Sequence, residues 1–301
     1  MGGPSPEHEI SLKSGTAVFN ALKELGLEAV SVVLPRDLEE RVSNLEGLFK
    51  ELLDDSRIDV VFNTLHGNFG EDGTFQKILE NLKVPYTGSN SKASYLGMDK
   101  IASRRIFEDA DIPVPSYRIL DKRKSVRIDF SLPLVVKPAR GGSSIGVSIV
   151  EEKEHLQKAI DLAFNYDERI IIEEYIQGKE ITVAILEDRA LPVIQIVPQR
   201  KFYSYEAKYK DRETGYLLPA PIGKDLQEKA KINAVKAHRA LGCSGFSRVD
   251  MILSKEGIPV VLEVNTIPGL TSRSLLPKAA QAEDISFPYL CLKILESAWV
   301  K

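Results

Sequence analysis

The stretch Ser247-Arg-Val-Asp-Met-Ile-Leu-Ser-Lys-Glu-Gly-Ile-Pro-Val-Val-Leu-Glu-Val-Asn265 decides the fold of this chain. Two β-like runs flank the turn-prone segment 254–257, a pattern that predicts a β-hairpin. Side chains alternate between the two faces of a strand. Within each run, two polar residues therefore share a face: Arg248 with Asp250, and Glu263 with Asn265.

The register of this hairpin decides whether the four polar side chains lie together. If Leu253 pairs with Ile258 across the turn, all four lie on one face. The other face is then a core surface, made of Val249, Met251, Val260, Leu262 and Val264. The two carboxylates and the amide suit oxygen ligation of Mg²⁺, and the arginine can face a developing negative charge. The alternative is an edge hairpin with a solvated polar face, which two acids and an asparagine without a lysine fit poorly.

Length and composition exclude several classes of protein. The 301 residues are 43% hydrophobic, which predicts two or three domains with an ample core. A formal net charge of −3 without a basic stripe argues against nucleic-acid binding. Two distant cysteines, Cys243 and Cys291, indicate core residues in a reducing compartment. With no signal peptide and no run long enough to span a membrane, the sequence predicts a cytoplasmic protein.

The first ninety residues alternate predicted helices with predicted strands. Helices are expected at 11–25, 45–53 and 75–82, and strands at 28–34, 58–63 and 84–86. This alternation predicts an open parallel α/β sheet with ligand loops at its strand ends. Residues 1–6 are predicted as a loop where such a domain normally opens with a strand. Either the chain starts further upstream, or something else covers that position in the sheet.

Beyond the prolines of segment 111–115 the pattern predicts antiparallel strands with intervening helices. The expected strands are 134–137, 147–150, 169–174 and 181–186, and the expected helices are 154–164 and 226–241. Another helix, 102–110, is expected before the prolines, which end it. The tail, residues 274–299, is predicted to be largely helical. The fold class is therefore α/β followed by α+β.

Lys137-Pro-Ala-Arg-Gly-Gly-Ser-Ser-Ile-Gly146 lies between two of these predicted strands. Its four small residues, Gly141 to Ser144, let backbone N–H groups approach an anion, and Lys137 could neutralise phosphate charge. The segment lacks the Gly-Lys-Ser/Thr of a Walker loop. An ordinary hairpin loop is the alternative, but the nearby Mg²⁺-type cluster favours nucleotide binding.

Four further segments are candidate site regions. Glu173 and Glu180 follow strand ends, where acids suit an adenine edge and ribose hydroxyls. Residues 199–219 are basic and aromatic without regular periodicity, which favours a lid over bound phosphates; a single-stranded nucleic-acid platform is the alternative. His66 lies in a glycine-rich loop at a strand end. Ser274 lies at a helix start, which suits a carboxylate pocket or a plain N-cap.

The chain resembles the D-alanine–D-alanine ligases of the ATP-grasp superfamily, from Gly2 to its last helix. The resemblance rests on an ordered set of motifs: Gly2-Gly-Pro-Ser-Pro-Glu-His-Glu-Ile-Ser-Leu-Lys-Ser-Gly15, Leu65-His-Gly-Asn-Phe-Gly-Glu-Asp-Gly73, Tyr86-Thr-Gly-Ser89, Met98-Asp-Lys100, Val136-Lys-Pro-Ala-Arg-Gly-Gly-Ser-Ser-Ile-Gly146, Tyr205-Glu-Ala-Lys-Tyr209, Arg248-Val-Asp250 and Glu263-Val-Asn-Thr-Ile-Pro-Gly-Leu-Thr-Ser272. The ordered set is far more specific than any one motif.

The resemblance implies three domains and a reaction. An N-terminal α/β domain would span 1–91, and two ATP-grasp lobes would span 92–180 and 181–301, the second with a lid loop at 199–220. ATP would phosphorylate one D-alanine, and the amine of a second would displace phosphate to give D-alanyl-D-alanine for peptidoglycan synthesis. Two Mg²⁺ ions, for which Mn²⁺ can substitute, and a homodimer formed through the N-terminal domain are also implied.

The resemblance also implies residue roles. Substrate groups would be held or stabilised by Glu7, His66, Ser143, Tyr209, Arg248, Gly269, Ser274 and Leu275. Of these, Glu7 would bind the first amine and join Ser143 and Tyr209 in a hydrogen-bonded set; Arg248 and the Gly269 N–H would stabilise the tetrahedral oxyanion; Ser274 and the Leu275 N–H would hold the second carboxylate. ATP would be bound by Lys100, Lys137, Ser144, Glu173, Ile176, Glu180 and Lys208, and Mg²⁺ by Asp250, Glu263 and Asn265.

Tyr209 favours the dipeptide product, because relatives that make D-alanyl-D-lactate carry histidine there. Two departures from the family pattern are the absent first strand and Glu174, where many relatives have lysine. Two alternatives stay open: a ligase with another acceptor, such as D-lactate or D-serine, and a nucleotide-binding regulator without turnover. The intact set around Arg248 argues against the regulator.

Overall fold

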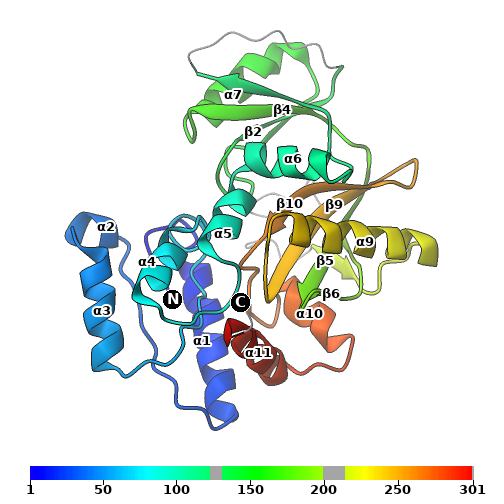
Figure 1. Cartoon of the computed structure of the whole chain (residues 1–301). Coiled ribbons are helices and arrows are strands. Elements are labelled where there is room, and N and C mark those ends of the chain that lie inside the picture. The colour runs from blue at the N-terminus through cyan, green and yellow to red at the C-terminus, as the bar shows by residue number, and fades with distance from the viewer. Residues whose placement is uncertain (123–130, 199–213, 300–301) are drawn as a thin grey trace.

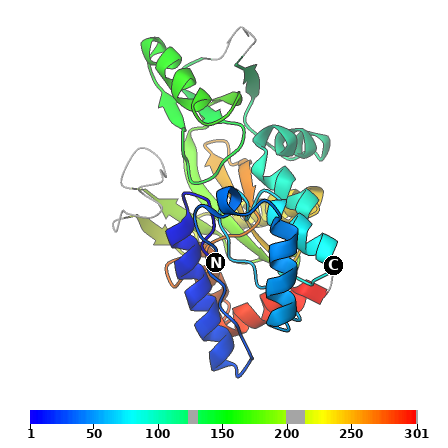
Figure 2. The ribbon, with the colours of Figure 1, turned by 90° about the vertical axis from the view of Figure 1, so that its left-hand side faces the viewer.

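The computed structural model describes residues 1–122, 131–198 and 214–299. Two antiparallel sheets lie one above the other in Figure 1, with the N-terminal helices beside the lower sheet. Figure 2 shows the first helix running alongside the last elements of the chain. No helix in the described ranges is long and apolar enough to cross a membrane.

The N-terminal region is built mainly from helices. They are α1 (His8–Glu24), α2 (Leu38–Arg41), α3 (Leu45–Asp55), α4 (Thr74–Leu82) and α5 (Ser91–Met98). The three strands predicted there shrink to isolated bridges, Gly2 with Leu34 and Val61 with Tyr86, and both are parallel as predicted. One reason is chemical. Pro85 offers only its carbonyl to Val61, and the N–H of Asn63 bonds the Thr87 hydroxyl in place of a backbone carbonyl.

The opening residues occupy the sheet position that lacked a predicted strand. Leu34 donates its N–H to the Met1 carbonyl and accepts from the Gly3 N–H, each at 2.9 Å, and the Met1 ammonium donates to the Val32 carbonyl. Gly2 is required here, because a Cβ at this position would lie 2.6 Å from the Leu34 oxygen. Gly2 therefore forms a β-bridge within the segment 1–6 that is predicted as a loop.

The upper sheet has four strands in the order β1-β4-β2-β3: β1 (Tyr117–Asp121), β2 (Leu134–Pro138), β3 (Ser148–Val150) and β4 (Arg169–Glu174). All its pairings are antiparallel, as predicted. The short η1 (Lys153–His155) leads into α7 (Leu156–Phe164), which packs Ala159, Ile160 and Ala163 on this sheet. Helix α6 (Lys100–Asp109) lies between the two sheets in Figure 1.

The lower sheet contains β5 (Gly178–Leu186), β6 (Arg189–Ala190), β7 (Ile194–Val197), β8 (Gly215–Leu217), β9 (Phe246–Ser254) and β10 (Pro259–Asn265). Its order is β10-β9-β5-β7-β8, with β6 paired to β5. Helix α9 (Lys224–Ala240) covers one face. The end of the predicted lid that the structure describes is thus strand β8; residues 199–213 lie outside the described ranges.

The hairpin of β9 and β10 differs from the predicted register. Leu253 pairs with Pro259 and not with Ile258. The neighbouring bond from the Ser254 N–H to the Ile258 carbonyl places Pro259 at a non-hydrogen-bonded position, where its missing N–H costs nothing. A shift between Val261 and Glu263 then restores the polar pairing.

This bulge changes which apolar residues face the core. Val261, and neither Val260 nor Leu262, joins the buried cluster with Val249, Met251 and Val264. Leu262 instead lines a pocket beside Glu263, as two consecutive residues can at a bulge. The polar face itself is confirmed: Glu263 stands opposite Asp250, and Asn265 opposite Arg248.

The two ends of the chain share one core. The tail forms α10 (Leu275–Gln281), α11 (Phe287–Glu296) and η2 (Ser297–Trp299). Val18 and Leu22 of α1 belong to the same buried cluster as Leu290 and Ile294 of α11. Cys243 and Cys291 are buried and unbridged, as predicted.

Candidate functional site

Two pockets meet in the middle of the molecule. The inner pocket, of about 200 Å³, is lined by residues from α1, the His66 loop, β9, β10 and the start of α10. The intersheet pocket, of about 360 Å³, lies between the upper and lower sheets. Gly141, Gly142 and Glu263 line both. The glycine loop and one carboxylate therefore form a shared wall between them.

Every predicted site residue that the structure describes lines one of these pockets. The inner pocket holds Glu7, His66, Ser143, Arg248, Glu263, Asn265, Gly269, Ser274 and Leu275. The intersheet pocket holds Lys100, Lys137, Ser144, Glu173, Ile176, Glu180, Asp250 and Glu263. Lys208 and Tyr209 lie outside the described residues.

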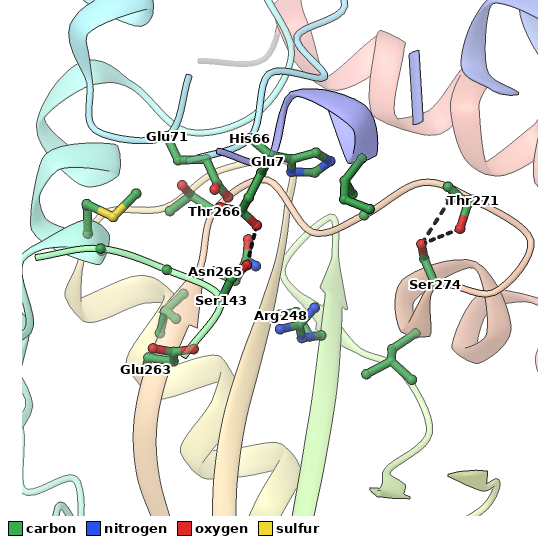
Figure 3. Close-up of a pocket in the computed structure, with 18 of the residues that line it drawn as sticks. Glu7, His66, Glu71, Ser143, Arg248, Glu263, Asn265, Thr266, Thr271 and Ser274 are labelled. Atoms are coloured by element: carbon green, nitrogen blue, oxygen red, sulfur yellow. Dashed lines mark hydrogen bonds between the residues drawn. The ribbon is translucent and has the colours of Figure 1, made fainter. Parts of the chain in front are cut away.

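Glu7 enters the inner pocket just before α1 begins. Its side chain does not cap the helix; the Ser143 hydroxyl of the glycine loop donates to its Oε1 (Figure 3). Ser143 has a φ of 54°, in the left-handed region that a non-glycine residue seldom adopts. This backbone conformation belongs to the loop that brings the hydroxyl to Glu7, across 136 residues of sequence.

His66 is buried in the same pocket, and Figure 3 shows it beside Glu7. Its Nε2 lies 3.2 Å from the Ser14 hydroxyl, which already accepts from the Leu270 N–H and so has its own proton to donate. Burial lowers the pKa of His66, against the opposing effects of Glu7 and of a bond to the Ile267 backbone. The ring is therefore neutral at pH 7.

Glu71 is a second buried carboxyl group in this pocket, and Figure 3 shows it beside Glu7. Its Oε2 accepts from the Gly67 N–H at 2.7 Å. Gly67 has a φ of 68°, and a Cβ there would lie 2.9 Å from a Glu7 oxygen. Burial, and then the charge of Glu7, raise the pKa of Glu71 well above its ordinary value. The pocket thereby favours one ionised acid over two.

Replacing Glu71 by glutamine is expected to raise the free energy of unfolding at neutral pH by about 1–3 kcal/mol. A carboxyl whose folded pKa is raised stabilises the fold below its unfolded pKa, and this contribution is lost as the pH rises through the folded value. Glutamine keeps an oxygen acceptor for Gly67 and has no proton to lose. Denaturant unfolding between pH 4 and 8 measures this, with exposed Glu51→Gln as control; equal pH profiles for both variants would contradict it.

Arg248 projects from β9 toward the centre of the inner pocket. Its guanidinium holds Asp250 in a two-pronged pair, with Nε–Oδ1 at 2.9 Å and Nη2–Oδ2 at 2.7 Å. The Thr182 hydroxyl of β5 also donates to Asp250, at 2.7 Å. These contacts fix the arginine in place while its charge still faces the pocket.

The far end of the inner pocket is formed by the loop before α10. Ser274 occupies the N-cap position, but its hydroxyl does not cap α10; it accepts from the Thr271 N–H at 3.0 Å and contacts the Thr271 hydroxyl at 2.9 Å. A Cβ on Gly269 would lie 2.8 Å from this hydroxyl, so the loop is tight. The side chain of Ser274 therefore does not act as a plain N-cap, which was one of its two predicted roles.

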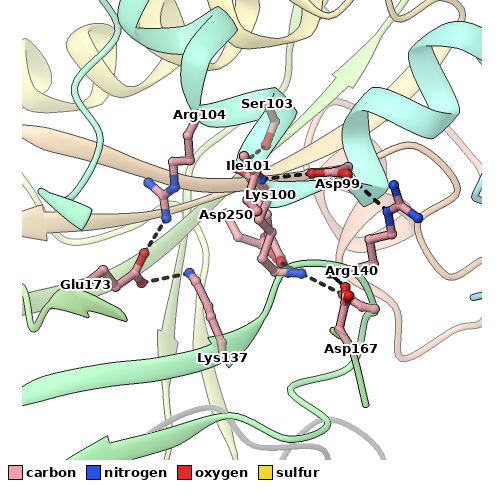
Figure 4. A network of polar contacts seen from close by, with 12 residues as sticks. Asp99, Lys100, Ile101, Ser103, Arg104, Lys137, Arg140, Asp167, Glu173 and Asp250 are labelled. Carbon is pink, nitrogen blue, oxygen red and sulfur yellow. Dashed lines mark hydrogen bonds and ion pairs between the residues drawn. The ribbon is translucent and has the colours of Figure 1, made fainter. Parts of the chain in front are cut away.

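Cations line the intersheet pocket on the side of the shared wall. Lys100, at the start of α6, donates to the Gly141 carbonyl at 2.6 Å and lies 3.8 Å from Glu263. Asp99 accepts two backbone N–H groups of α6 and pairs with Arg140 and Arg169, each at 3.0 Å. Asp99 therefore pins the glycine loop to the start of α6 (Figure 4).

The floor of the intersheet pocket carries a buried charge cluster. Lys137 of β2 donates to Glu173 Oε1 at 2.7 Å, and Arg104 of α6 donates to its Oε2 at 2.8 Å. Burial lowers the pKa of Lys137 to about 8, although Glu173 favours its charged form. The Glu173 carboxylate is thus the shared partner of two cations, Lys137 and Arg104.

The arrangement matches known proteins along its whole length. Family models described as "D-ala D-ala ligase N-terminus" and "D-ala D-ala ligase C-terminus" match residues 38–89 and 106–296. The curated D-alanine–D-alanine ligases of Geotalea uraniireducens and Pelotomaculum thermopropionicum are 44% and 41% identical to this chain, over 100% and 99% of it and 94% and 95% of their own lengths.

The chain belongs to the D-alanine–D-alanine ligase family. Solved structures agree. The Bacillus anthracis ligase has a TM-score of 0.84 at 37% identity, covering 99% of this chain and 95% of its own, and its ATP complex has a TM-score of 0.81 at 34% identity with the same coverage. The VanG D-Ala:D-Ser ligase of Enterococcus faecalis has a TM-score of 0.84 at 32% identity, covering 99% and 97%. The predicted ATP-grasp fold is confirmed.

The oxygen donors of this D-alanine–D-alanine ligase family member fit Mg²⁺ chemically. Asp250, Glu263 and Asn265 present carboxylate and amide oxygens on one face of the hairpin, the donor type that Mg²⁺ prefers. Within residues 1–122, 131–198 and 214–299 there is no cluster of three His, Cys, Asp or Glu residues for a metal. A Mg²⁺ ion at this hairpin would therefore need Asn265 as a ligand beside Asp250 and Glu263.

Three site residues escaped prediction: Glu71, Arg104 and Thr182. Glu71 stands inside a motif that carries the family resemblance, and this position is the sequence signal for it. Arg104 and Thr182 carry no local signal, because a charged residue in a helix and a threonine in a strand are usually surface residues. Their burial is set by tertiary packing.

Proposed function

We propose that the inner pocket and the intersheet pocket are the amino-acid half and the nucleotide half of one ligase site. The protein is an ADP-forming ligase that joins two D-alanine molecules through a D-alanyl phosphate. The observation that carries this proposal is the shared wall. Gly141, Gly142 and Glu263 border both pockets, so a carboxylate on one side can reach a γ-phosphate on the other.

The first D-alanine binds on the side of Glu7. An ammonium group in a buried pocket needs a charged partner, and Glu7 supplies it while Ser143 orients the carboxylate. The raised pKa of Glu71 supports a single negative charge there. His66, neutral and held by Ser14, lies close without competing as a cation.

The second step needs stabilisation of a tetrahedral oxyanion. Arg248, oriented by Asp250, and the Gly269 N–H supply it, and both line the inner pocket. The hydroxyl of Ser274 and the N–H of Leu275 hold the carboxylate of the second D-alanine. The family resemblance also implies a role for Tyr209 beside Glu7 and Ser143, and Tyr209 lies outside the described residues.

ATP occupies the intersheet pocket. Lys100, Lys137 and Lys208 neutralise its phosphates, and the Ser144 region of the glycine loop covers them. Adenine and ribose lie against the residues at the exit of β4 and start of β5: Glu173, Ile176 and Glu180. Two Mg²⁺ ions, replaceable by Mn²⁺, would be held by Asp250, Glu263 and Asn265, and would neutralise phosphate charge.

Several broader features belong to the same proposal. The domain boundaries lie at 91/92 and 180/181, close to where α5 and β5 begin, with residues 199–220 as a lid. The protein forms a homodimer through its N-terminal domain. It works in the cytoplasm, where ATP is available and where unbridged cysteines are usual.

Phosphate release from MgATP tests the function directly. We expect release with D-alanine and none with L-alanine, and D-alanyl-D-alanine as the product by mass. Adding D-serine or D-lactate to D-alanine tests the acceptor, and D-alanyl-D-alanine should remain the main product. A folded protein that binds ATP but releases no phosphate would favour the regulator instead.

A further inference from the structure

Arg104 is completely buried, which is rare for an arginine, and its guanidinium makes two directed contacts. Nη1 donates to the Val261 carbonyl at 2.8 Å, and Nη2 donates to Glu173 at 2.8 Å. Val261 belongs to β10 in the lower sheet, and Glu173 to β4 in the upper sheet. One side chain from α6 therefore ties together the two walls of the intersheet pocket (Figure 4).

The contact with Val261 lies on an edge strand, at the start of its bulge. Strand β10 lies at the edge of its sheet, so its outward backbone groups need partners from elsewhere. The Val261 N–H donates to the Pro113 carbonyl at 2.7 Å, and its own carbonyl accepts from Arg104. Val261 begins the bulge that places Leu262 and Glu263 on the pocket face.

The contact with Glu173 separates two roles among the cations. Arg104, with 0% of its side chain exposed, is locked between Val261 and Glu173, whereas Lys137 lines the pocket and shares Glu173. A buried carboxylate that loses its partner is strongly unfavourable. With Arg104 in place, Glu173 keeps a counter-charge when Lys137 turns toward a bound phosphate.

We propose that Arg104 is a positioning residue of the nucleotide pocket. It fixes Glu173 and the β10 bulge against each other, and it frees Lys137 to pair with ATP. This inference rests on the proposed function, because it takes the intersheet pocket as the ATP site. Arg104 acts through Glu173 and Val261 and touches no substrate.

Replacing Arg104 by methionine keeps the length of the side chain and removes both contacts. We expect the KM for ATP to rise at least about tenfold, while the KM for D-alanine changes less than about twofold. Arg105→Met is the matched control, because Arg105 is the next residue on the same helix and its side chain is exposed. Equal changes in the two KM values, or an ATP KM like that of the control, would overturn the proposal.

If Arg104 had only a structural role, replacing it would weaken the binding of both substrates alike. A double-variant cycle adds a sharper test. Glu173→Gln removes the charge that Arg104 balances. The ATP KM of the R104M/E173Q protein should therefore rise less than the product of the two separate changes. A rise in the ATP KM of the double variant equal to the product of the two single-variant rises would contradict the proposed role of Arg104. If R104M does not fold, R104K serves, since one ammonium cannot make both contacts.

The failure of this inference can be told apart from failure of the proposed function. Titration calorimetry with MgATP, without D-alanine, measures nucleotide affinity whether or not the protein turns over. Unaltered protein that binds no ATP refutes the proposed function itself. If R104M binds ATP as tightly as the unaltered protein does, only the proposed role of Arg104 is refuted.

Discussion

Replacing Arg248 by methionine is expected to lower kcat/KM for D-alanine by about 10²–10³-fold, the usual cost of removing one oxyanion donor. The Arg248 side chain is 12% exposed, and its guanidinium is held by both oxygens of Asp250, so no other side chain can take its place without breaking that pair. The loss should fall mainly on kcat, because the charge that Arg248 faces develops during the reaction. Steady-state kinetics with both substrates varied measures it.

Two further variants make the result specific. Arg239→Met removes an exposed arginine whose partner, Asp188, lies 3.7 Å away, and should leave the kinetics unchanged. Arg248→Lys keeps the charge but not the two-pronged geometry, and should recover only part of the activity. A kcat of R248M within about threefold of the unaltered protein would remove Arg248 from the chemical step.

The second large effect is expected at Glu7. Glu7→Gln should lower kcat/KM for D-alanine by about 10²-fold or more, since a buried ammonium would lose its charged partner. Ser143→Ala, which only releases the orientation of Glu7, should cost about tenfold. The KM for ATP should change little in either variant, because the nucleotide lies beyond the shared wall.

Glu9 provides the matched control for Glu7. It lies two residues further on α1, is exposed, and pairs with Arg36 at 2.9 Å on the surface. Glu9→Gln should leave kcat/KM unchanged. If E7Q and E9Q behave alike, the ammonium is bound elsewhere, and Glu71 becomes the next carboxyl group to test.

Much of the fold follows from periodicity in the sequence. The polar face of the 247–265 hairpin was predicted because alternation along a strand is a local property. Its register was not, because that depends on where Pro259 can tolerate its missing N–H and on a bulge that only the pairing of whole strands decides. The observed register places Leu262 in the intersheet pocket and not in the core, and it leaves the four polar side chains on one face.

The structure of the N-terminal region and the burial of certain charged residues could not be predicted from the sequence. The segments around Leu34 and Val61 have the composition of strands, yet they form single parallel bridges, because few of their backbone groups meet in register. The predicted site residues that the structure describes all line one of the two pockets. Arg104 and Glu71 became visible only through burial, which arises from contacts between distant segments.

The packing of α1 against α11 has a consequence for synthesis in the cell. Val18 and Leu22 emerge from the ribosome long before their partners Leu290 and Ile294, which lie much later in the chain. The chain grows at about 5–20 residues per second, so the first helix waits many seconds with its apolar face exposed. This core, and with it the seating of Glu7 against the glycine loop, can therefore be completed only after α11 has been synthesised, and a chain cut before α11 should be a client of chaperones.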